Sequence, residues 1–103
     1  MMQDLITKLI EKKAEDVVLI DTTPLTPYYD ECIIATALNQ RHIKSLIEFT
    51  EDYLIENGLR VKDIQGTPDS EWMIIDAYDT IIHILTDNER TRLSLDQIIK
   101  RNR

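Results

Sequence analysis

Acidic side chains are the first candidates for chemistry in this sequence, because phosphoryl and nucleotidyl transfer use carboxylates to hold two Mg²⁺ ions about 4 Å apart. Carboxylates spaced by two residues on one strand would point to the same face of a sheet. Asp21 and Asp76 each stand alone in their strand-like runs, while Asp30 and Glu31 are adjacent and would point to opposite faces. The predicted strands therefore offer no paired carboxylates for this chemistry.

The segment Asp69-Ser-Glu71 has the spacing of two, but it follows the turn signals Gly66, Thr67 and Pro68. No glycine-rich phosphate-binding loop precedes it. These absences favour a binding module that is not an enzyme, which is the leading hypothesis. A nucleotide-binding or nucleotidyltransferase-type domain is the alternative.

The single cysteine, Cys32, is the only thiol available as a nucleophile, and His42 or His83 would have to serve as its base. Cys32 lies in an apolar run, where a thiol is usually buried and inert, and no oxyanion donor is evident. One cysteine and two histidines on distant elements also make a poor metal set. We predict no catalytic residue, no metal and no cofactor.

A lone cysteine forms no internal disulfide, so the cytosol is the expected compartment.

The elements that must position these residues are predicted from apolar spacing. In the first half, a helix is expected over 5–13, a strand covered on both faces over 17–20, and a second buried strand over 32–35. Asn39 can cap the next helix, which continues to Asn57-Gly58. This helix is the longest of the chain.

The second half is predicted to be richer in strands. A weak strand is expected over 61–64, and the runs 72–77 and 80–85 predict a hairpin around Tyr78-Asp79. Thr86-x-x-Glu89 has the spacing of a capping box and opens a last helix. The order αββαβββα predicts an α/β fold with a mixed β-sheet of about five strands packed by helices, in one domain over 1–103.

A two-residue turn gives the hairpin two different faces, because opposed residues of an antiparallel pair share a face. One face is expected to form core and carries Met73, Ile75, Ala77, Ile82 and Ile84. The other, here called the Trp72 face, carries Trp72, Ile74, Asp76, Ile81, His83 and Leu85. Tryptophan is frequent at binding hot spots, although Trp72 as a plain core or rim residue is the alternative. Asp76 and His83 are expected to be diagonal neighbours close enough to form a structural hydrogen bond.

The net charge is −7, from 12 basic and 19 acidic residues. Wrapping nucleic acid requires a basic stripe, so we expect little direct nucleic-acid contact. An acidic surface favours a basic protein partner through electrostatic steering. No apolar run approaches the roughly 20 residues that span a bilayer, so no membrane contact is expected.

Two blocks of sequence resemble the ribosomal silencing factor family, also called Iojap or RsfS. The segment 66–85 reads GTPDSEWMIIDAYDTIIHIL and is followed by Arg90, and the segment 30–36 reads DECIIAT and is followed by Arg41-His42. The resemblance implies a nucleotidyltransferase-like fold without transferase activity. It implies a cytoplasmic repressor that binds the fourteenth protein of the large ribosomal subunit at the intersubunit face and blocks joining of the small subunit.

The resemblance also implies site residues. Trp72 matches the family's interfacial tryptophan, Leu93 falls where a tyrosine is usual, and Leu95 matches a leucine of the last motif. Acidic residues near the hairpin, including Asp79, are expected to steer the basic partner. A homodimer through the Trp72 face is a third alternative. The predicted partner-binding residues are Trp72, Asp76, Asp79, Arg90, Leu93 and Leu95.

Overall fold

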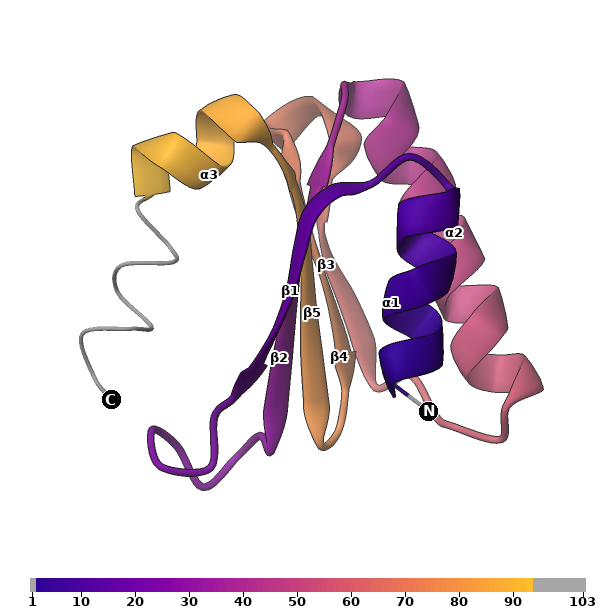
Figure 1. Ribbon diagram of the computed structural model, residues 1–103, viewed down its shortest axis with the longest axis vertical. Coiled ribbons are helices and arrows are strands. Elements are labelled where there is room, and N and C mark those ends of the chain that lie inside the picture. The colour runs from indigo at the N-terminus through magenta and orange to yellow at the C-terminus, as the bar shows by residue number, and fades with distance from the viewer. Residues whose placement is uncertain (1, 94–103) are drawn as a thin grey trace.

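The structure, a computed structural model, describes residues 2–93 of the 103-residue chain. Its elements follow the predicted order αββαβββα, with one added 3₁₀ turn, and confirm the α/β class (Figure 1). They are α1 (Met2–Glu11), β1 (Glu15–Asp21), β2 (Glu31–Ala37), α2 (Gln40–Glu56), β3 (Asp63–Thr67), η1 (Pro68–Ser70), β4 (Trp72–Ala77), β5 (Thr80–Thr86) and α3 (Asp87–Leu93).

The strands form one five-stranded sheet in the order β1-β2-β5-β4-β3. β2 and β5 are parallel, and the other neighbours are antiparallel, so the predicted mixed sheet of five strands is confirmed. In the sequence, α2 connects β2 to the second group of strands. In the sheet, β5, the last of the described strands, occupies the centre between β2 and β4.

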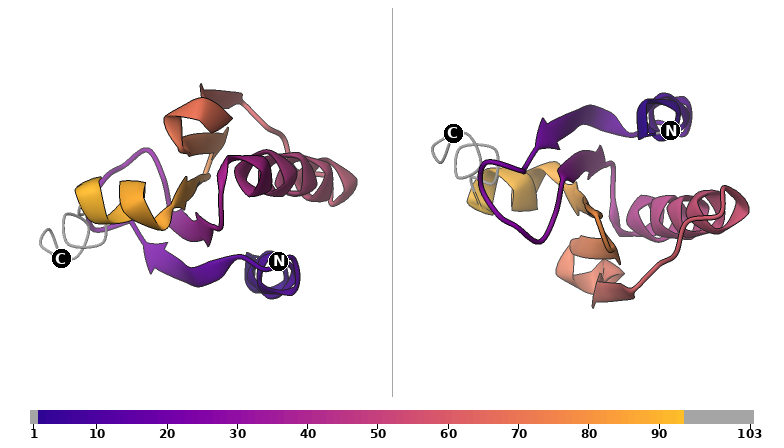
Figure 2. Two further views of the ribbon diagram at one scale, coloured as in Figure 1. Left: turned by 90° about the horizontal axis from the view of Figure 1, so that it is seen from above. Right: turned by 90° about the horizontal axis from the view of Figure 1, so that it is seen from below.

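The helices cover the two faces of the sheet unequally. α1 and α2 lie together on one face, and the short α3 lies on the other face near one end (Figures 1 and 2). The main core forms under α1 and α2, because the helices direct apolar stripes at the sheet. Its fully buried side chains include Leu5, Leu9, Ile33, Ile43, Leu46, Leu54, Ile75, Ile82 and Ile84.

The face that carries α3 has a smaller apolar cluster. Its buried members are Ile20, Cys32, Ile34 and Leu85, which come from β1, β2 and β5. The partly buried side chains of Val18, Trp72, Ile81 and Leu93 pack against them. The burial of Cys32 confirms that it is a core residue.

The hairpin register is the predicted one. Trp72 pairs with Leu85 and Ile74 pairs with His83, across the turn at Tyr78 and Asp79. The expected core residues of the other hairpin face all belong to the main core or pack against it. Tyr78 adopts a φ of 69°, and the Asp79 N–H donates to the carbonyl of Ala77, which is the pattern of a γ-turn. The tight connection fixes which side chains share the Trp72 face.

Two strand predictions need correction. β1 does direct Val17 and Leu19 to one cluster and Val18 and Ile20 to the other, but it is an edge strand, so only Ile20 is buried. The third strand was expected over 61–64, which is wrong in its bounds, because β3 is set by pairing with β4 from Asp63 to Thr67. Local propensity carries no information on this long-range register.

Helix ends follow their sequence signals more closely. The Asn39 side chain accepts from the His42 N–H, as expected for the cap of α2. Gly58 follows α2 with a φ of +76°, and the Leu59 N–H donates to the Leu54 carbonyl across it. α1 ends at Glu11, earlier than predicted, because Lys13 takes a φ of 75°.

Candidate partner interface

The backbone that presents Trp72 is fixed by the preceding turn. The Ser70 hydroxyl contacts the carbonyl oxygens of Thr67 and Trp72, at 2.7 and 2.8 Å. Glu71 has a φ of 61°, which turns the chain from η1 into β4. Gly66, opposite Met73, has a φ of +87°, and a Cβ there would overlap the carbonyl oxygen of Trp72. This close packing leaves little freedom at the start of β4.

The Trp72 side chain is half-buried and has an internal partner. Its Nε1–H donates to Nδ1 of His83 at 3.1 Å. The two rings are nearly parallel, with centroids 5.9 Å apart and an interplanar angle of 20°. Burial lowers the pKa of His83 to about 4, which keeps the imidazole neutral and Nδ1 available as an acceptor near neutral pH.

Asp76 lies diagonal to His83, as predicted, but the two side chains do not form the expected hydrogen bond. The Tyr29 hydroxyl donates to Asp76 Oδ2 at 2.9 Å, and the Tyr78 N–H donates to Oδ1 at 3.0 Å. The bond to Asp76, together with burial, raises the pKa of Tyr29. Asp76 therefore ties the β1–β2 loop to the Trp72 face.

The acidic residues expected to steer a partner lie at two ends of the hairpin. Asp69, in η1, is exposed, and Glu71 is partly exposed at the Trp72 end. Asp79 is exposed in the β4–β5 turn at the opposite end, where its carbonyl accepts from the Asp30 N–H at 2.7 Å. Only the first pair lies beside Trp72.

Arg90 is buried between α3 and the sheet. Its Nη1 donates to the carbonyl oxygen of Asp16 at 2.7 Å and to Oγ1 of Thr36 at 2.8 Å. Asp16 lies in an irregularity of the β1–β2 pairing with a φ of 47°. These contacts hold α3 against the sheet, and a direct contact of Arg90 with a partner stays a prediction.

Two leucines were predicted at the end of the interface. Leu93, the last described residue, packs against the same apolar cluster as Trp72. Leu95 lies outside the described residues. The structure thus brings Trp72 and Leu93 to one cluster, with Arg90 beneath α3, and leaves Asp79 at the far turn.

Sequence reasoning missed two contacts at this surface. Tyr29 was not assigned any role, and its bond to Asp76 spans 47 residues, so no local pattern indicates it. The pairing of His83 with Trp72 was within reach, because the correct hairpin register places both on one face.

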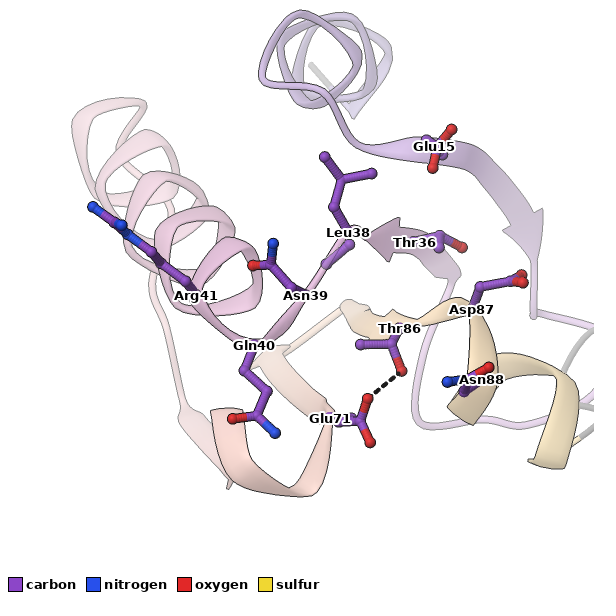
Figure 3. Close-up of a pocket in the computed structure, with 11 residues that line it drawn as sticks. Glu15, Thr36, Leu38, Asn39, Gln40, Arg41, Glu71, Thr86, Asp87 and Asn88 are labelled. Atoms are coloured by element: carbon purple, nitrogen blue, oxygen red, sulfur yellow. Dashed lines mark hydrogen bonds between the residues drawn. The ribbon is translucent and has the colours of Figure 1, made fainter.

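A hollow of about 590 Å³ lies at the end of the sheet where the parallel strands β2 and β5 finish and α2 begins (Figure 3). This is the place where open α/β sheets bind ligands. Three of its lining residues are acidic (Glu15, Glu71 and Asp87), and the cation that lines it is Arg41. Glu71 accepts a bond from Thr86, seen as the dashed line in Figure 3. Such a lining opposes the binding of phosphate.

Within residues 2–93, no group of three or more histidine, cysteine or acidic side chains is arranged to hold a metal ion. In the same part of the chain, no helix is both long and apolar enough to cross a membrane.

Comparison with known proteins decides the family. The family model described as "Ribosomal silencing factor during starvation" matches residues 1–103. The chain belongs to the ribosomal silencing factor family. This family is one of regulatory proteins rather than enzymes.

Individual relatives agree with the family assignment. The chain is 24% identical over 88 residues to the ribosomal silencing factor RsfS of Bacillus subtilis, covering 85% of this chain and 75% of the relative. It is 30% identical over 80 residues to RsfS of Chromobacterium violaceum, covering 78% of this chain and 66% of the relative.

Solved structures also share the fold. A crystal structure of a Chromobacterium violaceum protein matches with a TM-score of 0.90 at 25% identity, over 96% of this chain and 82% of that one. A Bacillus halodurans protein matches with a TM-score of 0.81 at 22% identity, over 94% and 90% of the two chains. The arrangement in Figure 1 is thus one found in experimental structures. The nucleotidyltransferase-like description of this fold stays a prediction.

Proposed function

We propose that this ribosomal silencing factor is a cytoplasmic translational repressor that docks on the large ribosomal subunit and blocks association of the small subunit. The contact is made with the fourteenth protein of the large subunit at the intersubunit face. The domain over 1–103 acts by obstruction and carries out no reaction. Family membership supports the role in ribosome regulation.

The observation that carries this proposal is the half-exposed Trp72, which packs against the apolar cluster on the sheet face opposite α1 and α2. Within residues 2–93, the short α3 helix is the one helix on that face, near one end (Figure 2). Trp72 and Leu93 there pack over an apolar cluster whose four central residues are buried. A large aromatic anchor on a rigid apolar base is the usual composition of a binding hot spot.

Charge favours a basic partner. The chain carries a net charge of −7, and Asp69 and Glu71 lie beside the start of β4. A ribosomal protein embedded in RNA is typically basic, so opposite charges accelerate the encounter and orient it. The association rate should therefore fall as the salt concentration rises.

Binding to isolated large subunits tests the docking step. Trp72→Ala should weaken co-sedimentation at least about fivefold, which corresponds to about 1 kcal/mol. Tyr28→Ala is the matched control, because Tyr28 is an aromatic residue that is 78% exposed in the β1–β2 loop. Equal binding by wild type and Trp72→Ala would remove Trp72 from the interface.

Subunit joining tests the repression step. Purified protein added to separated subunits at fixed Mg²⁺ should reduce joined ribosomes and increase free subunits, and Trp72→Ala should need a higher concentration for the same effect. An unchanged sedimentation profile at saturating protein would contradict the proposed function.

A second candidate is a homodimer closed by the same face, supported by the apolar side chains that Trp72, Ile81 and Leu93 contribute there. Sedimentation equilibrium of wild type and Trp72→Ala distinguishes the two roles. A dimer that Trp72→Ala abolishes would place self-association and ribosome docking in competition for one surface.

The nucleotide-binding alternative is supported by the position of the hollow beside β2, β5 and α2. Its acidic lining makes it the weaker candidate. Calorimetry with Mg²⁺ and a nucleoside triphosphate, on wild type and Glu71→Gln, tests it directly.

A further inference from the structure

The hydrogen bond between Trp72 and His83 has a consequence for how the proposed interface recognises its partner. Tryptophan has one polar atom, the Nε1–H donor. In this structure that donor is engaged by Nδ1 of His83 at 3.1 Å, on the neighbouring strand of the same sheet. An indole whose donor is already satisfied has no need of an acceptor on the partner.

His83 is well placed to act as a rigid acceptor. It lies on β5, the central strand, opposite Ile74 on β4 and Ile34 on β2. Its side chain is 9% exposed, so it has little freedom to rotate away. The nearly parallel rings add a second contact that restricts the plane of the indole. The orientation of Trp72 is thus determined by a side chain that is itself buried.

We propose that His83 is a positioning residue for Trp72: its Nδ1 accepts the indole N–H and fixes the ring on the Trp72 face, so that the partner meets ring carbon atoms. The surface recognised is accordingly an apolar patch on a basic protein, with no acceptor aimed at the indole N–H. This inference rests on the proposed function for the identity of the partner. A pre-oriented side chain loses less conformational freedom on binding, which increases affinity.

Two substitutions at His83 separate the acceptor from the bulk of the ring. His83→Asn places an amide oxygen near the position of Nδ1, while His83→Leu has similar size and no acceptor. Because Trp72 is the only tryptophan in the chain, the indole N–H gives one assignable signal in a ¹⁵N-edited NMR spectrum. Hydrogen exchange of that proton reports whether the bond persists in the free protein.

We expect the indole proton to be protected in wild type and His83→Asn and to exchange rapidly in His83→Leu. Affinity for isolated large subunits, measured on the same samples, should fall about three- to tenfold in His83→Leu and much less in His83→Asn. Undiminished affinity of His83→Leu would overturn the proposal, and so would an equal loss in both variants with the indole proton still protected in His83→Asn. If wild type fails to bind, the proposed function falls, and indole exchange alone decides whether His83 fixes the ring.

Trp72→Phe provides a test that leaves His83 in place and applies even where His83→Leu does not fold. Phenylalanine keeps an aromatic ring and lacks the donor. If the partner meets only ring atoms, Trp72→Phe should bind within about tenfold of wild type and more tightly than Trp72→Ala. Trp72→Phe also frees the ring from His83, which accounts for up to about tenfold. A loss well beyond tenfold, as large as that of Trp72→Ala, would overturn the proposal that the partner does not use the indole N–H.

Discussion

Arg90 on α3 donates a 2.8 Å hydrogen bond to the hydroxyl of Thr36 on β2, across 54 residues of sequence. The same guanidinium nitrogen donates to the carbonyl of Asp16. This side chain joins the last described helix to two strands of the first half of the chain. Its expected effect on stability is therefore larger than that of an ordinary surface arginine.

Arg90→Ala should lower the free energy of unfolding by about 2 to 4 kcal/mol, because it leaves the buried Thr36 hydroxyl and the partly buried Asp16 carbonyl without this partner. Arg92→Ala is the control on the same helix, since Arg92 pairs with Glu89 at 2.8 Å while 65% of its side chain is exposed. A pair so open to solvent contributes little to stability, so Arg92→Ala should be close to wild type. Urea denaturation followed by circular dichroism measures both. A stable Arg90→Ala variant that no longer binds large subunits would instead make Arg90 a direct contact.

Gly66→Ala should destabilise the protein by about 2 kcal/mol or more, because the new Cβ meets the Trp72 carbonyl oxygen and the φ of +87° is unfavourable for alanine. Gly58→Ala shares the positive φ, at +76°, but its Cβ would meet nothing within 4 Å. We expect Gly58→Ala to lose only about 1 kcal/mol. Thermal unfolding of the two variants compares steric overlap with backbone strain, and equal losses would contradict an overlap at Gly66.

His83 should make stability depend on pH in a defined range. Burial lowers its pKa from 6.5 to about 4, so the unfolded chain binds more protons between those values. The stability contributed by neutral His83 is present above about pH 6.5 and is lost as the pH falls toward 4, by about 3 kcal/mol in all.

His83→Asn, which does not titrate, is the reference for this effect. Asp63, Asp76, Tyr29, Cys32 and Arg90, which also lie on this face, are common to both proteins, and their contribution cancels in the difference. Urea titrations at pH 7, 5.5 and 4 should show the stability of wild type falling relative to that of His83→Asn. A difference that is constant with pH would mean that His83 titrates normally.

Tyr78→Gly should be more stable than Tyr78→Ala by about 1 kcal/mol, because the turn holds residue 78 at a φ of 69°. Both variants lose the contact between the Tyr78 ring and the Arg60 guanidinium, 5.6 Å from its centroid, so that contact does not affect the comparison. Denaturant midpoints at pH 7 measure the difference. Equal stabilities would indicate that the turn relaxes to a negative φ in the variants.

Features with a local cause were predictable from the sequence. The two-residue turn at Tyr78-Asp79 gave the correct hairpin register, and Asn39 and Gly58 marked the ends of α2. These signals act within a few residues, through hydrogen bonds and backbone conformation that the residue types themselves favour.

Features caused by distant pairing were not predictable in the same way. The bounds of β3 depend on β4, and the burial of Arg90 depends on Thr36 and Asp16. An arginine in a short helix reads as a surface residue until the strands that accept its hydrogen bonds are in place. For the candidate site, the role of Trp72 stays a prediction from the sequence, and the structure adds its bond to His83.

The central position of β5 also constrains synthesis of the protein. β5 lies between β2 and β4 in the sheet, yet it is the last of the five described strands to leave the ribosome. Until then β2 and β4 each keep an unpaired edge, and the parallel contact between β2 and β5 closes a loop of 49 residues, as between Glu31 and Thr80. We expect the nascent chain to stay incompletely folded until β5 has emerged, with its apolar strand edges open to chaperones.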